Sequence, residues 1–352
     1  MPSHIALGEG SGNAAVTASY SKSNTMPITF PDGVFDFESN PNYTQKYEIV
    51  TCGAIVYLDF DAIRLIEWLE LAQILAAEHV FLCTVQSSPN VNKILKYYIL
   101  QGFLEVVEWD TIVPTQSVGH IQSLVPSCEI HCSQLYQYQS KFIAHYDLDQ
   151  FIIPRFWGNT FPEFLRNYEP EHERKYGAPF GEIVFRNRYL FTNLKKSLAE
   201  NWEPKYLVGQ RYRFKWSSDY NLDQIKTIIR SPWCVVKYQH GCTSSFEKYR
   251  YRSNCSIGQG SINEGSKCYP NLGVYRMSKL INSKATLLEH ELGGVLHYKP
   301  CNWRPYQNCI LAEEKGEYDD SLEIYRYCLI KNVNDAIARM KLASVNFPQL
   351  EE

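Results

Sequence analysis

Apolar residues recur with two spacings that alternate along the first half of the chain. Unbroken apolar runs, such as Val80 to Val85, are typical of strands buried in a parallel sheet. Apolar residues three or four positions apart are typical of one face of a helix. The pattern predicts strands at 47–58, 80–85, 104–109 and from 141 onward, with helices at 62–75, 88–102 and 127–140 between them. This order predicts an α/β fold with a mostly parallel central sheet and helices on both faces.

Capping side chains support the predicted helix boundaries. Asp59 or Asp61 can cap the first helix, and Ser88 followed by a proline is typical of an N-cap and first helical turn. Gly102 is expected to end that second helix, because glycine readily adopts the left-handed conformation found after a helix. These local signals favour helices over strands between the apolar runs.

The second half of the chain is less regular. Thr160 and Glu163 resemble a capping box at the start of a short helix. Residues 1–45, rich in Gly, Ser, Asn, Ala and Thr, are predicted to form a flexible linker or stem. We expect 46–352 to form one folded domain that includes strands at 182–190, 224–230 and 234–239, substrate-framing loops at 256–273 and 291–296, and a closing helix at about 321–343.

The stretch 141–154 contains a pair of carboxylates, Asp147 and Asp149. Its first half alternates as a strand does, and if the extended path continues, both carboxylates point to one side. Neighbouring carboxylates repel unless a cation lies between them, and Mg²⁺ or Mn²⁺ prefers such oxygen ligands. Alternatively, one aspartate caps a helix and the other is solvated. Their place at the carboxyl end of a strand favours a ligand site, and a diphosphate-binding metal indicates a nucleotide-diphosphate substrate.

Composition narrows the possible functions. The 352 residues are 45% hydrophobic and carry a formal net charge of −3, which gives no general attraction to nucleic acid or anionic membranes. Two basic-aromatic runs, at 211–216 and 248–252, alternate cations with rings as ordinary half-buried strands do. We therefore expect no nucleic-acid partner.

No membrane segment is expected in this chain. The first 30 residues lack a basic segment followed by an apolar run, and the longest apolar region, 62–77, contains charged residues. Sequons at Asn42 and Asn254 would matter only in a lumenal protein.

The number and spacing of the cysteines bear on whether the protein folds in an oxidising compartment and whether it binds zinc. The chain has 11 cysteines and no C-x-x-C pair, which argues against a structural zinc site. Three pairs have spacings that would close loops in an oxidising compartment: Cys234 with Cys242, Cys255 with Cys268, and Cys301 with Cys309.

Five stretches, taken in order, together resemble glycosyltransferase family 92. They extend from about 50 to 300, and their specificity comes from the ordered set rather than from any one of them. They are 66–70, 91–102 with 104–109, 132–154 with the carboxylate pair, 226–232 with His240, and 296–298.

The resemblance implies a GT-A-like nucleotide-sugar-binding fold, a UDP-sugar donor, Mn²⁺ and inverting transfer to a glycan hydroxyl. The donor of the best-known members is UDP-galactose. The resemblance also implies a Golgi or secretory-pathway protein, although no signal or anchor is seen in this sequence and a soluble cytoplasmic member stays possible. Gln150 stands where the family usually has glutamate, which removes a negative charge beside the metal site.

The expected site residues follow from this chemistry. The metal would be held by Asp147, Asp149 and a downstream histidine, His297 ahead of His240. Cations stabilise phosphate charge, so further donor-binding residues would be Lys299 and Arg304; the alternative is that both are solvated. An inverting transfer also needs a general base, and the spacing does not select among its candidates, which are Asp223, Asp219 and Glu182.

Two other functions fit the carboxylate pair. An aspartyl phosphohydrolase also uses a D-x-D at a strand end, but it usually has Thr or Val two positions after the second aspartate, where this chain has Phe151. A catalytically degenerate protein that binds glycan or donor is the other alternative, and Gln150 is the residue that suggests it.

Overall fold

The computed structural model describes twelve stretches of the chain, and all statements below concern these residues. Every described residue belongs to one compact unit, 37–352. The predicted stem at 1–45 lies outside the description except for residue 45. The described stretches are 45–58, 60–109, 124–177, 179–193, 206–212, 214–216, 225–231, 234–238, 241–245, 285–288, 292–301 and 317–341.

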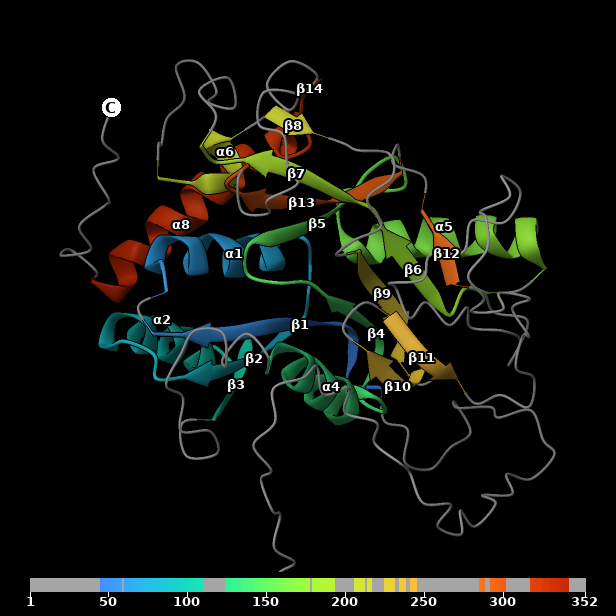
Figure 1. Ribbon diagram of the computed structural model, residues 1–352, viewed down its shortest axis with the longest axis horizontal. Helices are drawn as coiled ribbons and strands as arrows, with labels where there is room; N and C mark the ends of the chain where they lie inside the picture. Colours follow the sequence, from blue (N-terminus) through green and yellow to red (C-terminus); the bar gives the residue numbers. More distant parts are fainter. Residues whose placement is uncertain are drawn as a thin grey trace, which may run out of the picture. The chain divides into compact units, whose positions relative to one another are not determined.

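The larger sheet has seven strands, in the order β12-β6-β9-β4-β1-β2-β3 (Figure 1). The neighbours β4, β1, β2 and β3 are parallel, as predicted, but β9 runs antiparallel to both β4 and β6. The predicted parallel sheet is therefore only partly confirmed. The strands are β1 (Tyr47–Tyr57), β2 (His79–Val85), β3 (Leu104–Glu108), β4 (Ser140–His145), β6 (Glu182–Phe185), β9 (Lys226–Arg230) and β12 (Ala285–Leu287).

Helices cover both faces of this sheet, as predicted. Apolar side chains of α1 (Ala62–Ile74), α2 (Pro89–Leu100) and α5 (Phe161–Tyr176) join one buried cluster with side chains from one face. Side chains of α4 (Val125–Tyr136) form a second cluster with the opposite face. The C-terminal helix α8 (Arg326–Met340), preceded by a 3-10 turn at Glu323–Tyr325, packs on α1.

The predicted caps are present. Asp61 accepts hydrogen bonds from the backbone of Ile63 and Arg64 and begins α1, so Asp61 is the N-cap. Ser88 caps α2, and Thr160 caps α5 by accepting from the Glu163 amide. These local side chain to backbone bonds satisfy amide groups that have no partner inside the helix.

A second sheet of five strands, in the order β14-β8-β7-β13-β5, was not predicted. Its strands come from segments that the sequence pattern assigns to longer strands or to a loop. Thus the predicted strand 182–190 is divided into β6 and β7, and the predicted strand from 141 is divided into β4 and β5. The strands are β5 (Gln150–Pro154), β7 (Asn187–Phe191), β8 (Phe214–Trp216), β13 (Gly293–Lys299) and β14 (Glu317–Tyr318).

The predicted loop at 291–296 is wrong, because β13 begins at Gly293 and lies between β7 and β5 in the second sheet. Its glycines lie in tightly packed positions rather than in a turn. A Cβ at Gly293 would lie 3.1 Å from the Ile153 carbonyl oxygen, and a Cβ at Gly294 would lie 3.0 Å from Arg188 Nε. The predicted loop at 256–273 lies outside the described residues, and a hairpin of β10 (Cys234–Tyr238) and β11 (Gly241–Ser245) replaces the single strand predicted near 234–239.

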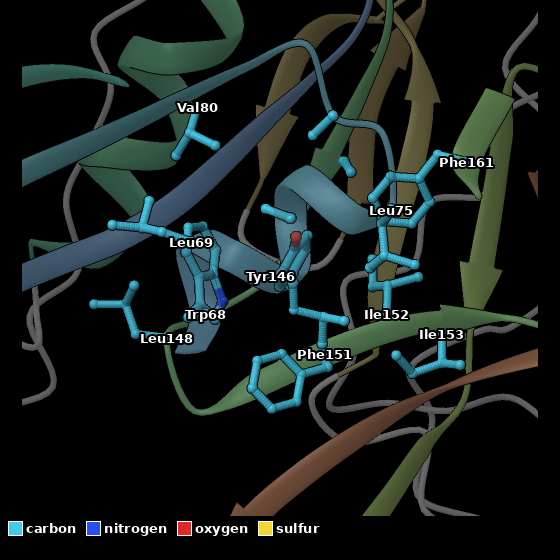
Figure 2. Close-up of a cluster of buried hydrophobic side chains, with 14 of the residues drawn as sticks. Trp68, Leu69, Leu75, Val80, Tyr146, Leu148, Phe151, Ile152, Ile153 and Phe161 are labelled. Atoms are coloured by element: carbon cyan, nitrogen blue, oxygen red, sulfur yellow. The ribbon is translucent and has the colours of Figure 1, made fainter. Parts of the chain in front are cut away.

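Helix α1 lies between β1 of the first sheet and β5 of the second (Figure 1), and its Trp68 is fully buried there. Figure 2 shows Trp68 beside Tyr146 and Leu148, and its ring centroid lies 5.1 Å from that of Tyr146. A Cβ at Gly53 of β1 would lie 3.0 Å from the Trp68 ring and 2.3 Å from Leu82. The glycine therefore makes room for the indole.

Glu67, also on α1, is fully buried and binds the start of the short helix α6 (Val208–Arg211). Its carboxylate accepts the backbone amides of Val208 at 2.9 Å and Gly209 at 2.8 Å. Burial raises the pKa of Glu67 to about 7, although these two hydrogen bonds oppose the increase. Glu67 is thus a titratable group within the core.

Two disulfides attach α4 to the sheet: Cys52 of β1 pairs with Cys132, and Cys83 of β2 pairs with Cys128. Neither was among the pairs suggested by spacing. Of those suggested, Cys301 is disulfide-bonded, but its suggested partner and the residues of the other pairs have no described side chains. In the described part of the chain, Cys328 is a free and exposed cysteine.

No helix in the described residues has the length and apolar character needed to cross a bilayer.

Replacing Cys83 and Cys128 together with serine is expected to lower the free energy of unfolding by about 2–4 kcal/mol, since their bond closes a loop with a sequence separation of 45 in the unfolded chain. Chemical denaturation of the oxidised proteins measures the difference. Cys328→Ser is the matched control and should change nothing. A double variant as stable as the parent would contradict the role given to this disulfide.

The stability contributed by Glu67 should depend on pH. Its pKa is about 7 in the folded chain against an ordinary value of 4.5, so the folded state holds the proton more tightly between these pH values. The free energy of unfolding should therefore fall by about 3 kcal/mol as pH rises from 4.5 to 7, relative to Glu67→Gln. Urea denaturation of both proteins across this range tests the slope, and parallel curves would contradict it.

Candidate functional site

The connections of the seven-stranded sheet identify one edge as the place for a ligand. From β1 the chain passes to β2 and β3 on one side, then returns to place β4 on the other side of β1. Ligands of open α/β sheets bind beside the carboxyl ends of strands where the order reverses in this way. Asp147 and Asp149 follow β4 directly and therefore lie at this edge.

The two aspartates lie on a turn, so the extended path does not continue through them. The Gln150 amide donates to the Asp147 carbonyl at 3.0 Å, and the Asp147 amide donates to Gln150 Oε1 at 3.2 Å. Trp68 Nε1 donates to the same Asp147 carbonyl at 3.1 Å. The turn redirects the chain from β4 in the first sheet to β5 in the second.

Asp147 pairs with a lysine of the first sheet. Lys226 begins β9, is 1% exposed, and its Nζ lies 2.9 Å from Asp147 Oδ2 and 3.8 Å from Glu129 Oε1. Burial alone would lower the pKa of Lys226, but the carboxylates of Asp147 and Glu129 raise it. The lysine therefore stays charged within the protein.

Asp149 pairs with residues of the second sheet. Its carboxylate forms an ion pair with Lys299 and lies 3.3 Å from His297 Nε2, both on β13. The backbone also connects the two segments, since the Tyr298 amide donates to the Asp149 carbonyl at 3.0 Å. Burial would raise the pKa of Asp149, but His297 and Lys299 hold it well below its ordinary value.

His297 is buried among polar and aromatic neighbours. Its Nδ1 lies 3.2 Å from Gln150 Nε2 and 3.0 Å from Asn187 Nδ2, and its ring stacks on Tyr189 with centroids 5.3 Å apart. Burial lowers the pKa of His297, against the raising influence of Asp149.

A divalent cation prefers carboxylate oxygens, and this turn carries two carboxylates. Asp147 Oδ1 is buried and has no hydrogen-bond partner among the described residues, so one hard oxygen ligand is unused. The described residues contain no cluster of three or more His, Cys, Asp or Glu side chains that could hold a metal. Mg²⁺ and related cations need only one or two carboxylates when phosphate oxygens of a substrate complete their coordination.

The structure does not bring every predicted site residue together. Glu182 is buried at the start of β6. The end of β6 that lies beside Lys226 is Phe185, three residues further along, so Glu182 lies at the end of β6 away from the two aspartates. His145, the last residue of β4, is fully buried with Nε2 3.2 Å from Ser133 Oγ. The remaining predicted residues lie outside the described part of the chain: Asp219, Asp223, His240 and Arg304.

The sequence interpretation missed three residues of the site, namely Lys226, Trp68 and Asn187. Lys226 and Trp68 lie in the stretches that carry the family resemblance, yet neither the hydrophobic pattern nor the spacing assigns them a role. In the sequence, Lys226 stands at the start of an apolar segment and Trp68 stands inside one, and neither position by itself indicates a contact with the aspartates. Their contacts with the turn come from distant elements.

Comparison with known proteins identifies one family. The sequence model of glycosyltransferase family 92 matches residues 47–340. No curated protein sequence matches the chain.

Among solved structures, the chain is similar to S. aureus TarS, with 15% identity over 52% of this chain and 28% of that chain, and a TM-score of 0.29. For TarS 1–349 in complex with UDP-GlcNAc, the identity is 12% over 52% of this chain and 45% of that chain, and the TM-score is 0.26. For the galactosyltransferase LgtC in complex with donor and acceptor sugar analogues, the identity is 12% over 52% of this chain and 58% of that chain, and the TM-score is 0.22. The chain thus spans less than two thirds of the length of each of these proteins.

Replacing Lys226 with methionine should lower the free energy of unfolding by roughly 3–5 kcal/mol, because it leaves buried Glu129 and partly buried Asp147 without their cation. Chemical denaturation measures the loss. Adding Glu129→Gln should recover part of it by removing one uncompensated charge.

Lys331→Met is the matched control for this prediction. Lys331 pairs with Asp335 on the exposed face of α8, so its loss should leave stability nearly unchanged. A Lys226→Met protein as stable as the Lys331→Met protein would contradict the account of the buried pair.

Proposed function

Since the chain belongs to glycosyltransferase family 92, we propose that it transfers a sugar from a UDP-sugar donor to a glycan hydroxyl with inversion, assisted by Mn²⁺ or Mg²⁺. The proposed sugar is galactose. The observation that carries this proposal is the turn after β4, where Asp147 and Asp149 lie at the carboxyl edge of the sheet in a chain of this family. A GT-A-like fold remains the proposed class for the whole domain.

The two aspartates are the proposed metal-holding residues. When bound, a divalent cation would neutralise charge on the leaving nucleotide diphosphate. Asp147 supports this role with its unpartnered oxygen, and Asp149 supports it with a carboxylate held ionised by its neighbours. The third predicted ligand, His297, remains a prediction.

Lys299 is the proposed partner of the donor diphosphate. Its side chain is 31% exposed and reaches Asp149, so a cation is present beside the proposed metal-holding group. A positive charge fixed near the leaving oxygens stabilises the charge that develops on them. Arg304 was predicted for the same task and stays a prediction.

The general base also stays a prediction. Inverting transfer needs a group that takes the acceptor hydroxyl's proton. Asp219 and Asp223 remain candidates from the sequence, while the position of Glu182 at the far end of β6 does not support a role beside Asp147.

The two disulfides support a secretory-pathway location, because such bonds form and persist in oxidising compartments. A Golgi location is therefore proposed together with the family's chemistry.

Asp149→Asn should lower the rate of donor turnover at least about 100-fold, since it removes the charge at the proposed metal site while keeping the size of the side chain. The assay incubates the protein with Mn²⁺ and a panel of nucleotide sugars and follows nucleotide release and transfer to a glycan. Asp335→Asn, on the exposed face of α8, is the control and should retain full activity.

The same assay separates the alternatives. Phosphate release from simple phosphomonoesters would support an aspartyl phosphohydrolase, and tight donor binding without turnover would support a degenerate binding protein. A fully active Asp149→Asn protein would contradict the assignment of Asp149.

A further inference from the structure

Arg64 lies in the first turn of α1, is partly buried, and reaches from this helix to the second sheet. Its Nη2 donates to the Tyr298 carbonyl of β13 at 3.3 Å. A residue in an antiparallel pair directs its amide and its carbonyl toward the same opposite residue, and the Tyr298 amide donates to the Asp149 carbonyl. The Arg64 guanidinium therefore lies beside Asp149, at the edge where the two aspartates lie.

Positive charge exceeds negative charge at this end of β13, among the residues that the structure describes. Lys299 already forms an ion pair with Asp149. Burial would raise the pKa of Asp149; its β13 neighbours lower it most, and Arg64 adds to that lowering, so the guanidinium is within electrostatic reach of the carboxylate. No ion pair of the described residues includes Arg64, and its charge is therefore left for another anion.

Two acids of α1 lie about one turn from Arg64, and both direct their oxygens to backbone amides. Asp61 is the N-cap and accepts amides of the first turn. Glu67 accepts two amides of α6, and burial raises its pKa to about 7, so much of it is protonated at neutral pH. Among the described residues, the guanidinium N–H groups that do not contact Tyr298 thus stay open to a ligand.

We propose that Arg64 binds the diphosphate of the donor together with Lys299, while the Tyr298 carbonyl holds the guanidinium in place. A guanidinium is always charged, and its paired N–H groups match two phosphate oxygens, which a lysine ammonium cannot do. The inference rests on the proposed function for the presence of a diphosphate at this edge. It adds a residue of α1 to a site otherwise built from the turn and β13.

Arg64→Gln removes the charge but keeps an N–H group that can donate to a carbonyl. Inorganic pyrophosphate, titrated calorimetrically in buffer with Mg²⁺, should bind this variant at least about tenfold more weakly than the parent, because charge-assisted hydrogen bonds are lost. The thermal midpoint should shift by no more than about 3 °C, since Arg64 is only partly buried. Arg166→Gln makes the same change on the exposed face of α5 and should bind pyrophosphate as the parent does.

Three results of this titration would overturn the inference. Equal affinity of Arg64→Gln and the parent would mean that Arg64 only supports the Tyr298 carbonyl. Equal losses in Arg64→Gln and Arg166→Gln would mean that net charge alone attracts the anion. A parent that binds no pyrophosphate would mean that this edge has no diphosphate site.

The unsubstituted protein gives a second measurement that does not depend on the folding of a variant. Phenylglyoxal modifies arginine side chains, and mass spectrometry of the digested protein follows each arginine separately. Pyrophosphate should slow the modification of Arg64 and leave that of Arg166 unchanged. Equal rates at Arg64 with and without pyrophosphate would overturn the inference.

Binding and turnover separate this inference from the proposed function. A parent that binds pyrophosphate through Arg64 but releases no nucleotide from any nucleotide sugar would support the assignment of Arg64 and contradict sugar transfer. Sugar transfer by the parent, with unchanged pyrophosphate affinity in Arg64→Gln, would support the function and overturn the assignment of Arg64.

Discussion

Two ion pairs, Asp147 with Lys226 and Asp149 with Lys299, determine the arrangement of the candidate site. Each lysine belongs to a different sheet, because Lys226 begins β9 and Lys299 ends β13. Charges this close in a partly buried setting attract strongly, and removing one partner leaves a costly unpaired charge. The turn between the sheets is therefore fixed from both sides, and the two carboxylates keep a defined relation to each other.

Other buried charges of the chain follow the same principle. Asp319, which is almost fully buried, forms ion pairs through Oδ2 with Arg155 Nη2 at 3.0 Å and Arg188 Nη1 at 3.5 Å. These pairs connect the segment before α8 to the end of β5 and to β7. Glu67 instead uses two backbone amides of α6. In each case the charged group joins elements that are distant in sequence.

The sequence predicted the parts of this fold that local interactions determine. The first βα units and the caps at Asp61 and Ser88 are confirmed because amphipathic spacing and capping hydrogen bonds act within a few residues. The break between β4 and β5 could not be predicted, since the apolar alternation continues past it and the turn is held by Trp68 and Lys226 from elsewhere in the chain. Likewise, the glycines of β13 indicate a loop until the neighbouring strands are in place. The carboxylate pair was found from its own residues, whereas its cationic partner in the first sheet required the tertiary structure.

The division of one D-x-D between two sheets has a consequence for how this protein matures. A chain in which only the seven-stranded sheet had assembled would hold Asp147 through Lys226 of β9 but leave Asp149 without its β13 neighbours. The candidate site is therefore complete only when β13, contributed by a segment almost 150 residues downstream, pairs with β5. Molecules without this pairing would thus lack part of the site, and a complete site would report that both sheets have formed.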